Sequence, residues 1–259
     1  MNKSLQKKEM QFPLIDSARF MKISGAALPW LTGITLLFLI VGLILIIRSP
    51  DDYQQGITVR IMYIHVPFAW LSTLCYIAMS IAALGSLIWN HDLASVALKC
   101  GAPIGAVFTA LALMTGALWG RSTWGTWWVW DARLTSVLIL FFIYLAIVTL
   151  ARAFDNQARA AHAIAILTLV GLVDIPIIKF SVSWWNTLHQ PTSFLRSGAI
   201  TIDRAMLWPL ITMMLCFTFM FALLYLMAMQ NEIVCRHIRT LQAKAVHRAR
   251  HQDSSSCLT

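Results

Sequence analysis

The amino-acid sequence predicts an all-α integral membrane protein, a bundle of about six transmembrane helices with both chain ends in the cytoplasm. Of its 259 residues, 59% are apolar and only 12% are charged, whereas a soluble domain carries about 25% charged residues. Disorder is excluded as well, because disordered chains are poor in apolar and aromatic residues. The apolar residues gather in runs of about 20, the length with which a helix crosses a bilayer.

Six apolar runs define the expected spans, and polar segments separate them. In chain order the spans cover about 25–47, 61–89, 100–119, 134–150, 163–180 and 205–229. The first run has no features of a cleavable signal peptide and is long enough to span. We therefore expect a polar N-terminal segment (1–24), a transmembrane unit (25–229) and a basic tail (230–259).

The positive charges set the orientation of the expected bundle. Six spans place both chain ends on one side, and 13 of the 20 Lys and Arg residues fall on that side. Because cytoplasmic segments carry the excess of Lys and Arg, we expect both ends in the cytoplasm and the connections 120–133 and 181–204 outside. Most of the excess behind the net charge of +9 lies in the two tails, which suits anionic lipid better than nucleic acid.

The five cysteines indicate neither a zinc site nor covalent attachment of a cofactor. They form no CxxC pair and no CxxCH sequence, the spacings that such sites use. Cys75, Cys100 and Cys216 fall in apolar runs, where a cysteine behaves as a small buried hydrophobe.

Two histidines lie on the outer side of the expected bundle. His65 is about one turn into the second span, and His189 is in the last outer connection. A single histidine at a membrane interface is usually just hydrogen-bonded, but two from separate segments on one face can bind one metal, and imidazole suits iron. Both interpretations stay open. The other histidines fall on the cytoplasmic side: His91, His162, His237, His247 and His251.

The connection between the third and fourth spans is rich in tryptophan. Five of the chain's 11 tryptophans lie in the 12 residues before Asp131: Trp119, Trp124, Trp127, Trp128 and Trp130. An aromatic belt would spread over all helices and both membrane faces, whereas this cluster lies in one connection. If the segment is a short helix, four side chains share one face: Trp124, Trp127, Trp128 and Asp131. Such a flat apolar surface suits a large planar ligand.

Cations surround this aromatic surface. Arg121 and Arg133 bracket the tryptophans, and Arg196 lies in the other outer connection, after the aromatic pair Trp184 and Trp185. Guanidinium groups pair bidentately with carboxylates, although any one of these arginines could equally face water or lipid headgroups. The outer side thus combines an aromatic surface, two imidazoles and cations, which is what a heme with its two propionates needs.

Two acidic residues could support the site or the fold. Asp131 could accept hydrogen bonds at a helix end, or it could hold a histidine or Arg133 in place. Asp174 lies in the fifth span close to Pro176, and an acid at membrane depth is costly. We expect a structural role for it, in a pair with Lys179 or with a backbone group that the proline frees.

Residues 124–135 read WGTWWVWDARLT and resemble a known signature. The signature is the WGxxWxWDxRLT sequence of the WWD heme-handling proteins of cytochrome c maturation. His65 and the stretch from Trp184 to Gln190 are similar to those of the six-span heme exporter protein C (CcmC) family. The resemblance covers the chain from about Arg60 to Trp208.

The resemblance implies a site for non-covalent heme b at the periplasmic face of a bacterial inner membrane. It implies that His65 and His189 are the axial ligands of the heme iron. It also implies that the WWD connection cradles the porphyrin, through Trp119, Trp124, Gly125, Trp127, Trp128, Trp130 and Asp131.

The resemblance further implies partners. Heme would be handed to the membrane-anchored heme chaperone CcmE, with CcmA, CcmB and CcmD in the same complex. This role is binding and delivery rather than catalysis, and whether the chain also promotes covalent attachment of heme to the chaperone stays open.

Three other functions remain to be distinguished. A diheme or quinone-reactive cytochrome subunit would carry histidines at mid-membrane depth, and none is expected there. A permease subunit of an ATP-driven transporter is the main alternative, since the chain has no GxxxxGK[ST] loop but could use a separate ATPase; a permease would not need the tryptophan cluster. A purely structural subunit leaves the histidine pair unexplained. A Soret absorption band separates heme binding from the last two.

Overall fold

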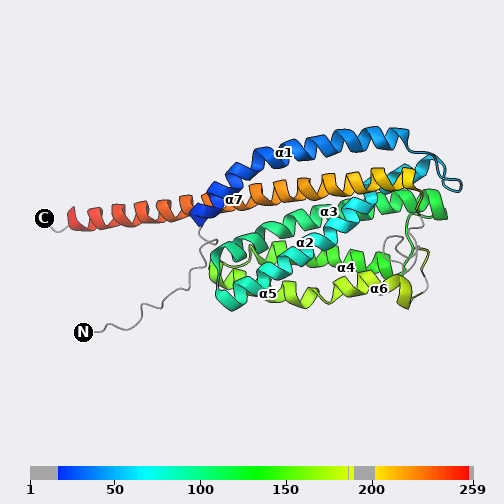
Figure 1. Ribbon diagram of the computed structural model, residues 1–259. Helices are drawn as coiled ribbons and strands as arrows, with labels where there is room; N and C mark the ends of the chain where they lie inside the picture. The colour runs from blue at the N-terminus through cyan, green and yellow to red at the C-terminus, as the bar shows by residue number, and fades with distance from the viewer. Residues whose placement is uncertain (1–16, 186, 190–201, 257–259) are drawn as a thin grey trace.

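The computed structural model describes residues 17–185, 187–189 and 202–256. This part of the chain contains six helical segments that are long and apolar enough to cross a membrane, as the sequence predicts (Figure 1). The elements in order are α1 (Ser17–Arg48), the short 3-10 helix η1 (Ile57–Ile61), α2 (Met62–Trp89), α3 (Asp92–Trp124), α4 (Ala132–Leu150), α5 (Gln157–Gly171), α6 (Asp174–Trp184) and α7 (Arg204–Ser256).

Helix α3 is longer at both ends than the expected span 100–119. Its start is fixed by His91, whose side chain accepts a hydrogen bond from the Leu93 backbone N–H at 3.2 Å. Asn90 takes the left-handed conformation (φ 47°) that ends α2. At the other end α3 continues to Trp124 and stops at Gly125, where φ is 76°. The connection expected at 120–133 is therefore non-helical only from 125 to 131.

The fifth span is interrupted in its middle, and α5 and α6 together form it. Pro176 lies in the first turn of α6, where the missing N–H of a proline is tolerated. The same proline would break a helix that continued from α5 through this position. Asp174 is buried beside this interruption, and its Oδ2 atom has no hydrogen-bond partner. The expected pairing with Lys179 is thus not seen.

The core lies between α2, α3, α4 and α5, which pack against one another. Two buried tyrosine side chains lie across this core, and a glycine on a facing helix leaves room for each of them. A Cβ on Gly105 would lie 2.1 Å from Tyr144 Cε1, and a Cβ on Gly171 would lie 2.2 Å from the Tyr76 hydroxyl. The Tyr144 hydroxyl donates to the Ser72 carbonyl at 2.7 Å. Small residues thus allow close helix contact, as is usual in membranes.

Helix α1 lies at the edge of the bundle and packs against α7. Its buried residues are all small: Ser24, Thr35 and Gly42. The Gln230 side-chain amide of α7 donates to the Ser24 hydroxyl at 2.7 Å. The Cys216 thiol of α7 also donates to the Thr35 carbonyl at 3.6 Å. Close approach of small residues and these interhelical hydrogen bonds therefore hold α1 in place.

The two ends of the bundle differ, as Figure 1 shows. The start of α1, the α2–α3 turn, the α4–α5 connection and the C-terminal half of α7 lie at one end, here called the terminal end. The opposite end, here called the tryptophan end, contains η1, the end of α3, residues 125–131 and the end of α6. Helix α7 runs past the bundle at the terminal end without a break at 230, and the boundary expected at 24 falls within α1.

Candidate functional site

The tryptophan end brings together both histidines expected on one face. His65 lies in the first turn of α2, and His189 follows the end of α6. Trp119 and Trp124 come from the last turns of α3, and Asp131 directly precedes α4. Four helix ends thus contribute to one site.

The His65 ring is held by α3. Its Nδ1 atom is 3.1 Å from the Ala112 carbonyl oxygen and 3.1 Å from the Thr115 hydroxyl oxygen. The Thr115 hydroxyl donates its own proton to the Leu111 carbonyl at 2.7 Å, so both atoms facing Nδ1 are acceptors. Nδ1 therefore carries the ring proton of the neutral imidazole, and the Nε2 lone pair is free to bind a metal.

Gly116 makes room for the His65 ring. A Cβ at this position would lie 2.9 Å from His65 Cε1, which is too close for any larger residue without a shift of the ring. Trp119 packs against the same imidazole in an edge-on arrangement, with ring centroids 5.6 Å apart. The ring orientation is therefore fixed by packing as well as by hydrogen bonds.

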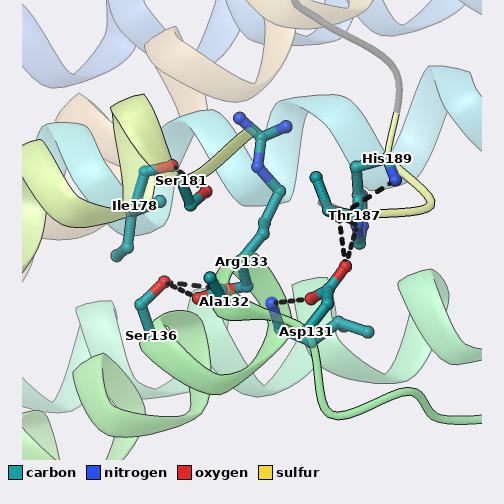
Figure 2. Close-up of polar contacts among 9 residues, drawn as sticks. Asp131, Ala132, Arg133, Ser136, Ile178, Ser181, Thr187 and His189 are labelled. Atoms are coloured by element: carbon teal, nitrogen blue, oxygen red, sulfur yellow. Dashed lines mark hydrogen bonds and ion pairs between the residues drawn. The ribbon is translucent and has the colours of Figure 1, made fainter. Parts of the chain in front are cut away.

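His189 is held by a carboxylate. Figure 2 shows Asp131, Thr187 and His189 in direct contact: His189 Nδ1 is 2.9 Å from Asp131 Oδ2, and the Thr187 hydroxyl donates to the same oxygen. The Thr187 hydroxyl also accepts the backbone N–H of His189 at 3.1 Å. Because Nδ1–H points at the carboxylate, Nε2 is again the free nitrogen.

Asp131 performs both roles that the sequence left open. While Oδ2 orients His189, Oδ1 accepts the backbone N–H of Leu134 at 2.7 Å and caps the start of α4. The same carboxylate thus connects the position of a helix to the orientation of an imidazole.

The charges of this pair follow from its surroundings. Burial alone would raise the pKa of Asp131, but hydrogen bonds from Thr187, Leu134 and His189 outweigh it and lower the pKa below its usual value. Burial lowers the pKa of His189, and the hydrogen bond and charge of Asp131 only partly oppose this. At neutral pH the site holds a carboxylate beside a neutral imidazole, the form that binds metals.

Arg133 lies near both imidazoles. Its charge acts on His65 and on His189, and the charge of His189 acts on His65. In Figure 2 the Arg133 side chain extends from α4 between Ser181 and His189. Within the described residues its buried Nε atom has no hydrogen-bond partner, and neither has the buried Nε1 atom of Trp128. Buried donors without partners are uncommon, and here they fit a ligand that brings acceptors, such as heme propionates.

The tryptophans do not form the single helical face expected for 124–131. That expectation is wrong because Gly125 ends α3 in a left-handed conformation. Instead Trp124 packs edge-on against His189, with centroids 4.8 Å apart, and Trp128 packs against Trp130 at 5.4 Å. Trp130 is 75% exposed and Trp127 57% exposed, so both lie at the surface of the described chain.

The ring contacts and hydrogen bonds of the remaining predicted residues are made with other groups than the two imidazoles, or the residue lies outside the described chain. Trp184 and Trp185 contact each other at 5.8 Å and are more than half exposed. Arg121 is exposed and donates to the Gly125 carbonyl, which closes the end of α3. Arg196 lies outside the residues that the structure describes.

Sequence analysis missed the residues that orient the histidines. Thr187 had a local signal, because Ser and Thr hydroxyls commonly bond the backbone two residues on. Ala112, Thr115 and Gly116 had none, since their contact with His65 is made between two helices.

The described residues contain no group of three or more His, Cys, Asp or Glu side chains that could hold a metal ion. A pair of imidazoles is enough where a porphyrin supplies the other four ligands of an iron ion. Together with the unpaired donors, this favours heme over a bare metal ion.

Six helices that are long and apolar enough to cross a membrane, with a histidine–tryptophan cluster at one end of the bundle, define the described part of the chain as a multi-pass membrane protein. Residues 11–244 match the family model described as heme exporter protein C (CcmC). The chain belongs to this family, which acts in cytochrome c maturation.

Relatives from several organisms agree with the family match. The heme exporter protein C of Bradyrhizobium diazoefficiens is 56% identical over 229 residues, which are 88% of this chain and 87% of the relative. The heme exporter protein C of Escherichia coli K12 is 46% identical over 217 residues, 83% of this chain and 87% of the relative. A putative cytochrome c biosynthesis ccmC-like mitochondrial protein of Marchantia polymorpha is 47% identical over 186 residues, 72% of this chain and 78% of the relative.

Proposed function

We propose that the chain binds heme b non-covalently at the periplasmic face of a bacterial inner membrane and presents it to the heme chaperone CcmE. The observation that carries this proposal is the pair of imidazoles at the tryptophan end. Both direct Nδ1–H at a protein acceptor and leave Nε2 free. Each also packs against a tryptophan of α3. This is the arrangement that two axial ligands of one iron require.

In this proposal His65 and His189 bind the iron from opposite faces of the porphyrin. Trp119 and Trp124, which pack against these two rings, would flank the heme. The unpaired guanidinium Nε of Arg133 makes it the strongest partner for a propionate, ahead of Arg121 and Arg196. The exposed Trp127, Trp130, Trp184 and Trp185 would then form the rim that a receiving protein meets.

The orientation in the membrane is also part of the proposal. The sequence assigns 13 of the 20 Lys and Arg residues to the side of the two chain ends, so the positive-inside rule would place both chain ends in the cytoplasm and the site outside. A green fluorescent protein fused after Thr259 should fluoresce, whereas alkaline phosphatase at the same position should be inactive. The reverse result would contradict this orientation.

The partners follow from the family. The relatives are named as heme exporters, and we propose that this chain works with CcmA, CcmB and CcmD as a binding and delivery subunit. The transmembrane unit 25–229 would hold the heme, and the basic tail 230–259 would stay in the cytoplasm.

The test is an absorption spectrum and a pyridine hemochrome assay on the detergent-purified protein. Wild type should carry b-type heme, His65→Ala and His189→Ala should each change the axial-ligand spectrum, and Trp128→Ala should lower heme retention. Trp30→Ala, an exposed tryptophan on α1, is the control and should behave as wild type. A wild-type protein that stays colourless when produced with its partners and added heme would contradict the proposal and favour a permease subunit.

A further inference from the structure

The two imidazoles have chemically different supports. The Nδ1–H of His189 donates to the Asp131 carboxylate at 2.9 Å, and Thr187 holds that carboxylate in place. The Nδ1–H of His65 faces only neutral acceptors, the Ala112 carbonyl and the Thr115 hydroxyl. The histidine pair is therefore asymmetric.

This asymmetry changes how strongly each Nε2 donates to a metal. A carboxylate that accepts the proton of one ring nitrogen raises the basicity of the other nitrogen. A carbonyl or hydroxyl oxygen accepts the same hydrogen bond without a full negative charge, and hydrogen bonds to ionised acceptors are roughly twice as strong. His189 is therefore the stronger donor of the two.

We infer that His189 is the ligand that retains heme and that His65 is the ligand displaced when a receiving protein offers its own donor. This inference rests on the proposed function. In the exchange, His189 Nε2 would keep holding the iron, and the place of His65 Nε2 would pass to a neutral nitrogen donor of the receiving protein, such as an imidazole. Each nitrogen keeps its lone pair and its proton, so neither electrons nor protons are transferred.

The surroundings of His65 suit a ligand that is given up and recaptured. Its ring is held between Trp119 and the surface of α3 at Gly116, and its hydrogen bonds to α3 do not involve Nε2. The ring therefore keeps its position when the bond to iron breaks, and heme that is not taken can bind again.

The experiment identifies the retained histidine by vibrational spectroscopy. Full-length, heme-loaded protein in detergent is reduced and exposed to carbon monoxide, which takes the iron site of the weaker ligand. A laser flash releases the gas, and resonance Raman spectroscopy then records the iron–nitrogen stretch of the histidine that stayed bound. This stretch depends on the hydrogen bond at Nδ1 of that histidine.

Asp131→Asn is the decisive variant. Asparagine can still cap α4, because its Oδ1 can accept the Leu134 N–H. Its NH2 group then takes the place of Oδ2 and cannot accept the Nδ1–H of His189, which therefore loses its carboxylate acceptor. The iron–nitrogen stretch should move to lower frequency in this variant. Thr187→Val, which removes the hydroxyl that holds the carboxylate, should shift it less and in the same direction.

Two controls separate the outcomes. Asp203→Asn removes the same charge from the carboxylate that accepts the Ala205 N–H at the start of α7, and Thr115→Val removes one acceptor of His65; both should leave the stretch unchanged. A stretch that responds to Thr115→Val, or that ignores Asp131→Asn, overturns the inference. A wild-type protein without heme contradicts the proposed function itself, which is a different result.

Discussion

In both the middle of the bundle and its tryptophan end, a glycine leaves room for a ring from a facing helix. The two regions differ in whether the polar group of that ring has a hydrogen-bond partner. In the middle, Gly105 admits the ring of Tyr144, whose hydroxyl is bonded to the Ser72 carbonyl. At the tryptophan end, Gly116 admits the ring of His65, whose Nε2 is left without a bond.

This difference between a bonded and an unbonded polar group shows which contacts serve stability and which serve ligand binding. In the middle, the buried hydroxyls of Tyr76 and Tyr144 both donate to backbone carbonyls, because an unpaired polar group in the membrane is costly. At the tryptophan end, the described residues provide no hydrogen-bond partner for the buried Arg133 Nε and Trp128 Nε1 atoms, and both imidazoles make their hydrogen bonds through Nδ1. Changes in the middle should therefore cost stability, and changes at the tryptophan end should cost ligand binding.

The largest effect on stability is expected from Gly105→Ala. The added Cβ would lie 2.1 and 2.2 Å from two ring atoms of Tyr144 and 2.6 Å from its hydroxyl oxygen, and the side chain is fixed by its own hydrogen bond. Overpacking of this kind costs about 1–3 kcal/mol, and we expect the upper part of that range in thermal unfolding in detergent. Gly33→Ala is the control, since its Cβ would meet nothing within 4 Å. Equal stability of the two variants would contradict this account of the core.

Gly116→Ala, at the tryptophan end, should affect heme binding more than stability, in contrast to Gly105→Ala in the middle. Its Cβ would press on His65 at 2.9 Å from Cε1, but an imidazole at the end of a side chain can turn away more easily than the buried Tyr144 ring. We expect a smaller loss of melting temperature than in Gly105→Ala, together with an altered axial-ligand spectrum. An unchanged heme spectrum would show that the orientation of His65 does not matter for binding.

The pH dependence of the heme-free protein tests the environment of His189. The pKa of this imidazole is lowered from its usual 6.5, so the unfolded chain takes up a proton at a higher pH than the folded one. The contribution of His189 to stability is therefore full above pH 6.5 and is lost as the pH falls towards the lowered pKa. The difference in melting temperature between wild type and His189→Gln should shrink from pH 7.5 to pH 5. A difference that grows in acid would contradict the lowered pKa.

The smallest effects on stability are expected from two aromatic substitutions that each remove one polar group. Tyr144→Phe removes a hydroxyl that is bonded to Ser72 and should cost about 0.6 kcal/mol, as interhelical hydrogen bonds in membranes do. Trp128→Phe makes the ring smaller and removes an N–H that has no partner among the described residues; it should cost the heme-free protein less stability than Tyr144→Phe while lowering heme retention. If Trp128→Phe destabilised the heme-free protein as much as Tyr144→Phe, Trp128 would be a packing residue.

The six spans could be predicted because the bilayer demands apolar helices of a minimum length. Their ends could not be predicted as well. Helix α3 begins with a histidine cap at His91, a residue type that is not among the usual caps, and it ends at Gly125 instead of at the expected membrane boundary. The interruption before Asp174 did have a signal, since Pro176 cannot continue a helix.

The residue types of the site could be predicted from the sequence, but the contacts between these residues could not. His189 and most of the site tryptophans stand out because they gather in segments outside the apolar runs, and His65 stands out as a polar residue about one turn inside such a run. The support of His65 comes from a backbone carbonyl and a hydroxyl 47 and 50 residues away, and any residue type provides such a carbonyl. The link from Asp131 to His189 spans 58 residues and depends on how α4 and α6 pack.

The most direct test of the central claim is electron paramagnetic resonance of the ferric, heme-loaded protein. If one heme lies between His65 and His189, wild type holds one low-spin heme per chain, and His65→Gly and His189→Gly each turn it high-spin. Added imidazole should then restore the low-spin signal in both variants by filling the empty position. A low-spin signal that survives in either single variant without imidazole would contradict the claim that these two histidines bind the same iron.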